Sequence, residues 1–130
     1  MYGINGFRKL VDILKEFNFE FVDFFSYKKA NHPSIIFRHD VDFSLDDALK
    51  IASLEEKLEI KATYFFMLTT NSYSAISYHN KNLIKEIKEK GHNISLHFDP
   101  TAYQDMDKGF CLEKKLFEDI FDVEVKIVSL

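Results

Sequence analysis

The chain has 130 residues, the size of one compact domain, so two large domains are excluded. Hydrophobic residues make up 46% of the sequence, which supplies enough apolar surface to offset the entropy lost on ordering and argues against extensive disorder. The formal net charge is -4 and there is no basic tract, so nucleic acid is not expected as the principal partner, because its binding needs clustered Lys and Arg.

The cysteine content and the N-terminal residues indicate whether the protein is cytoplasmic or secreted. The single Cys111 cannot form an internal disulfide, and residues 1–20 lack the basic, apolar and small-residue order of a secretory signal. No stretch of about 18 uninterrupted apolar residues is present, so no membrane span is expected. These features predict a soluble, cytoplasmic protein.

The first element expected is an amphipathic helix over residues 7–17, where Phe, Leu and Val recur at helical spacing with charged residues between them. We expect it to end near Asn18. The Phe-rich segment 19–25 alternates poorly, and its pattern leaves both a short strand and an irregular apolar segment open. Pro33 then marks a break in the chain.

The remaining chain alternates apolar runs with helical patterns. Ser44 followed by two aspartates opens one helix as a capping box would, and Gly91 ends another. Expected strands cover 34–40, 61–68, 92–98 and 123–130, and expected helices cover 44–58, 80–90 and 108–121. This alternation predicts βαβ crossovers and a parallel sheet, so the fold class is α/β and residues 1–130 form a single domain. In such sheets the ligand site lies outside the carboxyl ends of the strands.

The expected strand 34–40 changes directly from apolar to ionisable residues at its carboxyl end. Asp40 and Asp42 are two residues apart, so an extended chain can present both carboxylates to one pocket. Carboxylates that close repel each other unless a cation neutralises them, which suits a metal site or an acid/base pair. Helix capping is an alternative role for Asp42, because Ser44 and the helix follow directly.

The next two strands end in polar residues as well. Thr69 and Asn71 follow the second strand and could hold a substrate or water, and His97 and Asp99 follow the third. Asp99 also precedes Pro100, so turn formation is an alternative role for it. Mixed nitrogen and oxygen ligands of this kind are typical of divalent metal sites.

Two segments carry a family resemblance. FRHDVDFSLDDALKIASLEEKLEIKATYFFML, followed by IKEKGHNISLHFD, resembles the polysaccharide deacetylases, also called the NodB-homology or carbohydrate esterase 4 family. The match is close over about residues 34–100 and looks most like the cytoplasmic branch associated with surface-polysaccharide gene clusters. The resemblance implies a distorted (β/α) barrel, a divalent metal and hydrolysis of the acetamido group of an N-acetylated carbohydrate or related small molecule.

Roles follow from the same motifs. Asp40 matches the family's general base, and Asp42 and His97 match metal ligands. Thr101 stands where the family pattern has a second histidine, and Asp99 is the nearest substitute ligand. The resemblance therefore implies a divalent metal, with zinc first and manganese, cobalt or magnesium as alternatives.

Substrate contacts are expected from three polar residues at the strand ends, His39, Thr69 and Asn71. A closed (β/α) barrel takes about 200 residues or more, so this chain is expected to form an open part of one, incomplete at its C-terminal end. We find no residue for the general acid and expect weak or no activity from this chain. The uncovered terminal strand 123–130 predicts association into a homo-oligomer.

Two other functions fit part of the pattern. The run from Asp40 to Leu45 resembles the signature of haloacid-dehalogenase-like phosphatases, with Asp40 as nucleophile, magnesium as metal and Thr69 or Thr70 as a second-strand hydroxyl. Against it, the predicted helix leaves no room for that family's flap, and His97 has no role. The third hypothesis is a non-catalytic remnant that acts as a binding module, which Thr101 favours.

Overall fold

The computed structural model describes residues 3–130. Its helices are α1 (Ile4–Glu16), α2 (Leu45–Lys57), α3 (Tyr78–Glu89) and α4 (Met106–Phe121), with two 3₁₀ turns, η1 (Tyr27–Lys29) and η2 (Pro100–Ala102). Its strands are β1 (Glu20–Val22), β2 (Ser34–Ile36), β3 (Arg38–Val41), β4 (Thr63–Phe66), β5 (Asn93–His97) and β6 (Val128–Ser129).

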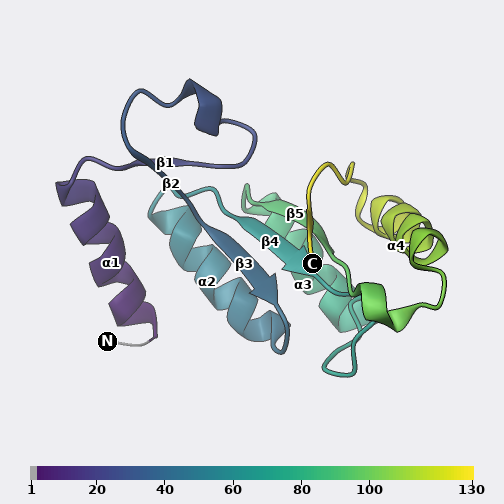
Figure 1. Cartoon of the computed structure of the whole chain (residues 1–130). Helices are drawn as coiled ribbons and strands as arrows, with labels where there is room; N and C mark the ends of the chain where they lie inside the picture. Colours follow the sequence, from purple (N-terminus) through teal and green to yellow (C-terminus); the bar gives the residue numbers. More distant parts are fainter. Residues whose placement is uncertain (1–2) are drawn as a thin grey trace.

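The strands form two sheets, and within each sheet the paired strands run parallel (Figure 1). β1 and β2 pair with each other, and the main sheet has the order β3-β4-β5-β6, so each strand pairs with the next one along the chain. The α2 and α3 crossovers connect β3 to β4 and β4 to β5, which confirms the predicted βαβ units. The main sheet curls into half of a (β/α) barrel, as the α/β prediction required.

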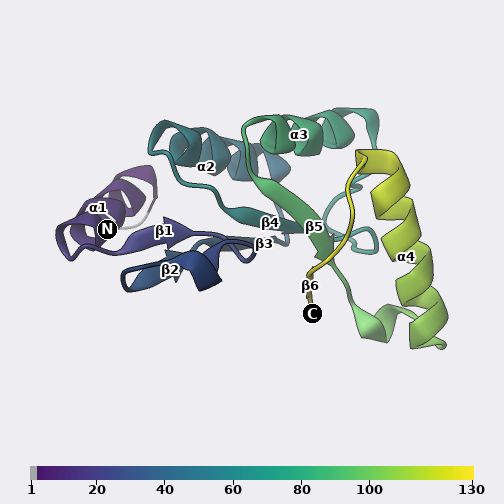
Figure 2. The ribbon, with the colours of Figure 1, turned by 90° about the horizontal axis from the view of Figure 1, so that it is seen from above.

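The core lies between the main sheet and its helices. Figure 2 shows α2 and α3 on one side of β3, β4 and β5, with β1 and β2 toward the other side. Tyr64, Phe66 and Leu96 point to the helical side and are fully buried against the helices. Because side chains alternate along a strand, Asp40, Phe65 and the residues in register with them face the inner side of the curl.

Local signals account for the helix boundaries. The Ser44 hydroxyl accepts a hydrogen bond from the Asp47 backbone N–H at 3.2 Å, so the predicted capping residue starts α2. Gly91 has φ +97° directly after α3, a conformation in which a Cβ would be strained, and it ends that helix as predicted.

Two expected strands differ from the structure. Residues 34–40 contribute to two strands in different sheets, β2 and β3, with Phe37 between them. The Phe37 ring packs on the rings of Phe7 and Phe21. The final strand covers only residues 128–129 rather than 123–130. Residues 123–127 run beside β5 without joining the ladder, apart from the Ser95 hydroxyl, which donates to the Ile127 carbonyl at 2.5 Å. Within residues 3–130, no helix has the length and apolar character needed to cross a membrane.

Candidate functional site

The carboxyl ends of β3 and β5 bring two predicted ligands together. Asp42 follows β3 and His97 ends β5, and the distance between Asp42 Oδ1 and His97 Nδ1 is 3.3 Å, although β4 lies between the two strands. The proximity of the carboxylates and the imidazole, predicted from the strand ends, is therefore confirmed for this pair. The Asp42 side chain is half exposed, and Ser44 supplies the helix cap, so Asp42 is not the residue that caps α2.

His97 is held in an unusual state. Its Nδ1 atom is the one buried side-chain nitrogen or oxygen of residues 3–130 that has no hydrogen-bond partner. The contact with Asp42 is close enough for an ion pair but lacks the geometry of a hydrogen bond. A buried unpaired imidazole nitrogen is energetically costly, and binding of a cation or water would remove that cost.

Asp40 is fixed by two residues that the sequence did not single out. Its Oδ1 and Oδ2 atoms accept hydrogen bonds from Arg38 Nη2 at 2.6 and 2.8 Å, and the Ser129 hydroxyl donates to Oδ2 at 2.9 Å. Burial alone would raise the pKa of Asp40, but the hydrogen bonds from Arg38 and Ser129 and the charges of Arg38 and His97 lower it. Asp40 is therefore a carboxylate at neutral pH, as a proton acceptor must be.

Asp99 takes part in a local turn. Its Oδ1 accepts hydrogen bonds from the Thr101 backbone N–H at 2.9 Å and the Thr101 hydroxyl at 2.6 Å. These hydrogen bonds lower the pKa of Asp99, with a further contribution from the charge of His97. The structure thus gives Asp99 the turn-forming role that its position before Pro100 suggested, and it uses Thr101 to hold that turn.

The chemistry of these groups fits a divalent cation in part. Asp42 and His97 offer one oxygen and one unpaired nitrogen side by side, a donor set suited to zinc or manganese. Within residues 3–130, however, no three His, Cys, Asp or Glu side chains converge closely enough to hold a metal ion. Arg38 and Ser129 donate hydrogen bonds to Asp40, and Thr101 donates to Oδ1 of Asp99.

The three expected substrate contacts lie in two cavities. Thr69 and Asn71 line a cavity of about 630 Å³ beyond β4 and β5, which Asp99 also lines. The Thr69 hydroxyl donates to the buried Glu113 carboxylate at 3.0 Å. His39 lines a different cavity, between β3 and α2, and contacts the carboxylate of Glu55 at 2.9 Å. The structure does not bring His39 together with the other two.

Tyr73 is a further residue that shapes the strand ends. Its hydroxyl donates to the Val41 carbonyl at 2.6 Å and accepts from the Met67 N–H at 2.8 Å, so it joins the last residue of β3 to the chain leaving β4. Burial and the nearby charge of Asp42 raise the pKa of Tyr73 to about 12, which keeps the hydroxyl protonated as a donor. No local sequence signal points to Tyr73, because its partners come from other segments.

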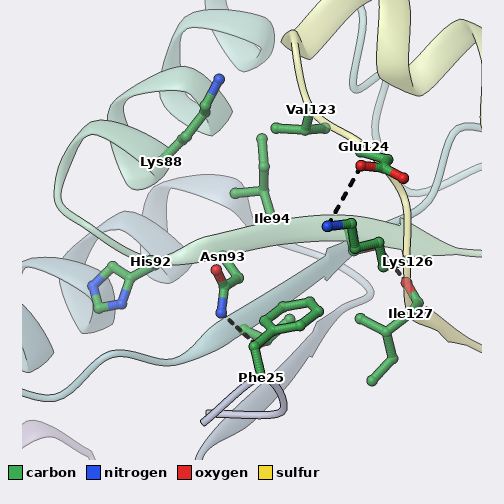
Figure 3. A pocket seen from close by; sticks show the side chains of 11 residues that line it. Phe25, Lys88, His92, Asn93, Ile94, Val123, Glu124, Lys126 and Ile127 are labelled. Atoms are coloured by element: carbon green, nitrogen blue, oxygen red, sulfur yellow. Dashed lines mark hydrogen bonds and ion pairs between the residues drawn. The ribbon is translucent and has the colours of Figure 1, made fainter.

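A further cavity lies at the opposite, amino end of β4 and β5 (Figure 3). Its volume is about 300 Å³, and Phe25, Asn93 and Lys126 are among its lining residues. The polar side chains around it already have partners: Asn93 bonds to Asp23 and Thr63, and Lys126 pairs with a neighbouring glutamate. It holds no cluster of unpaired ionisable groups and is not the candidate site.

The fold belongs to the α/β class, with a parallel sheet that curls into half of a barrel. The carboxyl edge of this sheet carries carboxylate and imidazole side chains. No protein-family model and no curated protein matches the sequence. Solved structures match the fold, and two of them are IcaB and PplD. IcaB from Ammonifex degensii has a TM-score of 0.73 and 13% identity over 95% of this chain and 64% of that one. The Streptococcus pyogenes deacetylase PplD, in complex with acetate, has a TM-score of 0.63 and 12% identity over 91% and 57%.

At these identities the two structures establish the fold. The chain spans less than two thirds of the length of either structure. Because PplD is a deacetylase, the resemblance drawn from the HDVD and GHNISLH motifs is supported at the level of the fold. Activity, substrate and metal are a separate question, which the site chemistry addresses.

Proposed function

We propose that the chain is a metal-dependent, deacetylase-like hydrolase that removes an acetyl group from an N-acetylated carbohydrate or a related amide. The observation that carries the proposal is the 3.3 Å contact between Asp42 Oδ1 and the unpaired, buried Nδ1 of His97, at the carboxyl edge of a fold shared with a deacetylase. Asp42 and His97 are the proposed metal ligands, and zinc is the first candidate metal. Such a metal, when bound, would polarise the acetyl carbonyl and acidify a water molecule.

Asp40 is the proposed general base. Its lowered pKa keeps it ionised at neutral pH, and Arg38 and Ser129 fix its position. Asp99 is the proposed further ligand through its Oδ2 atom, because both hydrogen bonds from Thr101 go to Oδ1. Its carboxylate would have to move toward Asp42 and His97, since no three His, Cys, Asp or Glu side chains converge within residues 3–130. Thr69 and Asn71, beside the larger cavity, are the proposed substrate contacts on that side.

The phosphatase alternative has less support. Its nucleophile would be Asp40, whose two oxygens are already bonded to Arg38 and Ser129, and α2 begins three residues after Asp42. The hydroxyl of Thr69 points to Glu113 rather than to Asp40. No observation favours this function over the hydrolase.

Zinc titration of the metal-free chain tests the proposal and separates it from a non-catalytic binding module. Calorimetry of the wild-type chain should give one zinc ion per chain with a micromolar or tighter Kd, and His97→Ala should abolish this binding. The matched control is His32→Ala, because His32 is exposed and makes no bond within the described chain. Equal zinc binding by the wild-type and His97→Ala chains, or none by either, would reject the proposed metal site.

A further inference from the structure

A second cavity borders the candidate site on the helical side of β3. It has a volume of about 300 Å³ and lies between β3 and α2. Asp42 belongs to its wall, so the cavity adjoins the proposed metal ligand, and His39, Phe43 and Ile51 line it as well. The proposed mechanism makes no use of these last three residues.

The cavity wall contains a histidine that a buried carboxylate holds in place. Glu55 lies on α2 with a fully buried side chain, and its Oε2 atom is 2.9 Å from His39 Nε2. Its other oxygen accepts a hydrogen bond from the Tyr64 hydroxyl. The His39 ring also packs on the Tyr64 ring, with 4.6 Å between centroids, so both the position and the orientation of the imidazole are fixed.

This arrangement determines which nitrogen of His39 is available to a ligand. Burial, together with the charge of Glu55 and its hydrogen bond, raises the pKa of Tyr64, so the Tyr64 hydroxyl stays a donor. We assign the hydrogen of this pair to His39 Nε2, because a carboxylate oxygen accepts from an N–H. In the neutral ring Nδ1 then has a free lone pair. It makes no hydrogen bond to residues 3–130 and is not buried, because His97 Nδ1 is the one such buried atom.

The remaining wall selects the chemistry of a ligand. Asp42 and Asp47 provide carboxylates, and no Lys or Arg is among the lining residues, so the polar groups mainly accept hydrogen bonds. Phe43 is 79% exposed and offers an apolar ring at the same wall. Hydrogen-bond acceptors beside an aromatic face suit a neutral ring that carries hydroxyl groups and an apolar C–H face.

We propose that this cavity is a binding site for a sugar ring next to the reacting acetamido group, with His39 Nδ1 accepting a hydrogen bond from a hydroxyl and Phe43 stacking on the ring. The inference rests on the proposed function, because the hydroxyl-rich ring belongs to the carbohydrate class of substrate. It assigns His39 to a different part of the substrate from Thr69 and Asn71, which line the other cavity. Glu55 acts through His39 as a positioning residue.

The test is an NMR titration of the full, metal-free chain with triacetylchitotriose. The imidazole nitrogen signals of His39 and the ring signals of Phe43 should shift saturably. His39→Gln is the informative variant, because the glutamine amide can still donate to Glu55 while the acceptor at Nδ1 is lost. It should weaken binding about tenfold, the effect of one hydrogen bond. Phe43→Ala should weaken binding about two- to tenfold.

Phe17→Ala is the matched control, since Phe17 is also an exposed phenylalanine, follows α1 directly and does not line the cavity. This variant should bind as the wild type does. The inference is overturned if triacetylchitotriose leaves His39 and Phe43 unshifted, or if His39→Gln and Phe43→Ala bind as tightly as the control. It is also overturned if methylammonium causes the same shifts, because the cavity would then select cations. Since the protein is metal-free in this titration, its result is independent of zinc binding, which tests the proposed function.

Discussion

Two aspartates at opposite ends of the parallel sheet, Asp23 and Asp42, have opposite surroundings. At the amino end, Asp23 is almost fully buried and accepts hydrogen bonds from the Phe25 and Ser26 backbone N–H groups at 2.9 Å and from Asn93 at 3.0 Å. At the carboxyl end, Asp42 is half exposed, and its one polar contact with the described residues is the 3.3 Å contact with His97. A carboxylate that stabilises a fold has its lone pairs occupied, whereas a carboxylate available to a ligand does not.

The same contrast holds for apolar side chains. Phe65 is buried on the inner face of the curl, where Phe24 packs edge-on against it and Arg38 lies 5.0 Å above its ring. Phe43, directly after Asp42, is exposed. The interior packing and the carboxyl edge can therefore be perturbed by separate substitutions.

Replacing Phe65 by alanine should cause the largest loss of stability. The cavity left on the inner face should lower the free energy of unfolding by about 3–5 kcal/mol. Phe43→Ala, the matched change at the carboxyl edge, should stay within about 0.5 kcal/mol of the wild type. Urea unfolding followed by far-UV circular dichroism measures both, and similar losses in the two variants would contradict the contrast between the two positions.

Zinc should stabilise the carboxyl edge selectively. If Asp42 and His97 bind zinc only in the folded chain, free zinc at 100 times its Kd should add about 2.7 kcal/mol to the free energy of unfolding. Thermal unfolding with zinc, and again after EDTA, measures the gain and its reversal. A gain of the same size in His97→Ala would show that the ion binds elsewhere.

Asp23→Asn should destabilise the fold at neutral pH. The amide cannot accept the same set of hydrogen bonds as the carboxylate, so we expect a loss of about 1–3 kcal/mol. Asp42→Asn in the metal-free chain should change stability by no more than about 0.5 kcal/mol, because its carboxylate makes no such bonds. Urea unfolding at pH 7 compares the two variants, and an equal effect of both would contradict the distinction drawn between the ends.

The effect of Asp23 should disappear in acid. Burial would raise the pKa of Asp23, but hydrogen bonds from Asn93, Ser26 and Phe25 and the charge of Lys61 lower it below its ordinary value. A lowered folded-state pKa gives stability that is complete above the unfolded pKa of about 4 and is lost as the pH falls through the folded pKa. The stability difference between the wild type and Asp23→Asn should therefore be constant from pH 7 to 5 and shrink below about pH 4. A difference that grows in acid would contradict this sign.

Local sequence patterns predicted those parts of the structure that depend on neighbouring residues. The Ser44 cap, the glycine stop at Gly91 and the βα alternation all reflect interactions over a few positions, and the structure confirms them. The approach of Asp42 to His97 was also predictable, since the carboxyl ends of parallel strands meet at one edge.

The remaining features depend on contacts between distant segments. Ser129, which bonds to Asp40, lies 89 residues away along the chain, and no local sequence pattern predicts that contact. One apolar run is divided between two sheets at Phe37, whose ring packs on rings from α1 and β1. The same holds for His39, whose partner Glu55 is a charged residue that a helical pattern would place on the surface.

The shortness of β6 affects how steadily Asp40 is held. Only Val128 and Ser129 pair with β5, so these backbone hydrogen bonds belong to a class that opens by local fluctuation well before global unfolding. Each such opening withdraws the Ser129 hydroxyl and leaves Arg38 as the partner of Asp40. Amide hydrogen exchange at position 129 would thus measure how often Asp40 loses one of its two hydrogen-bonding partners.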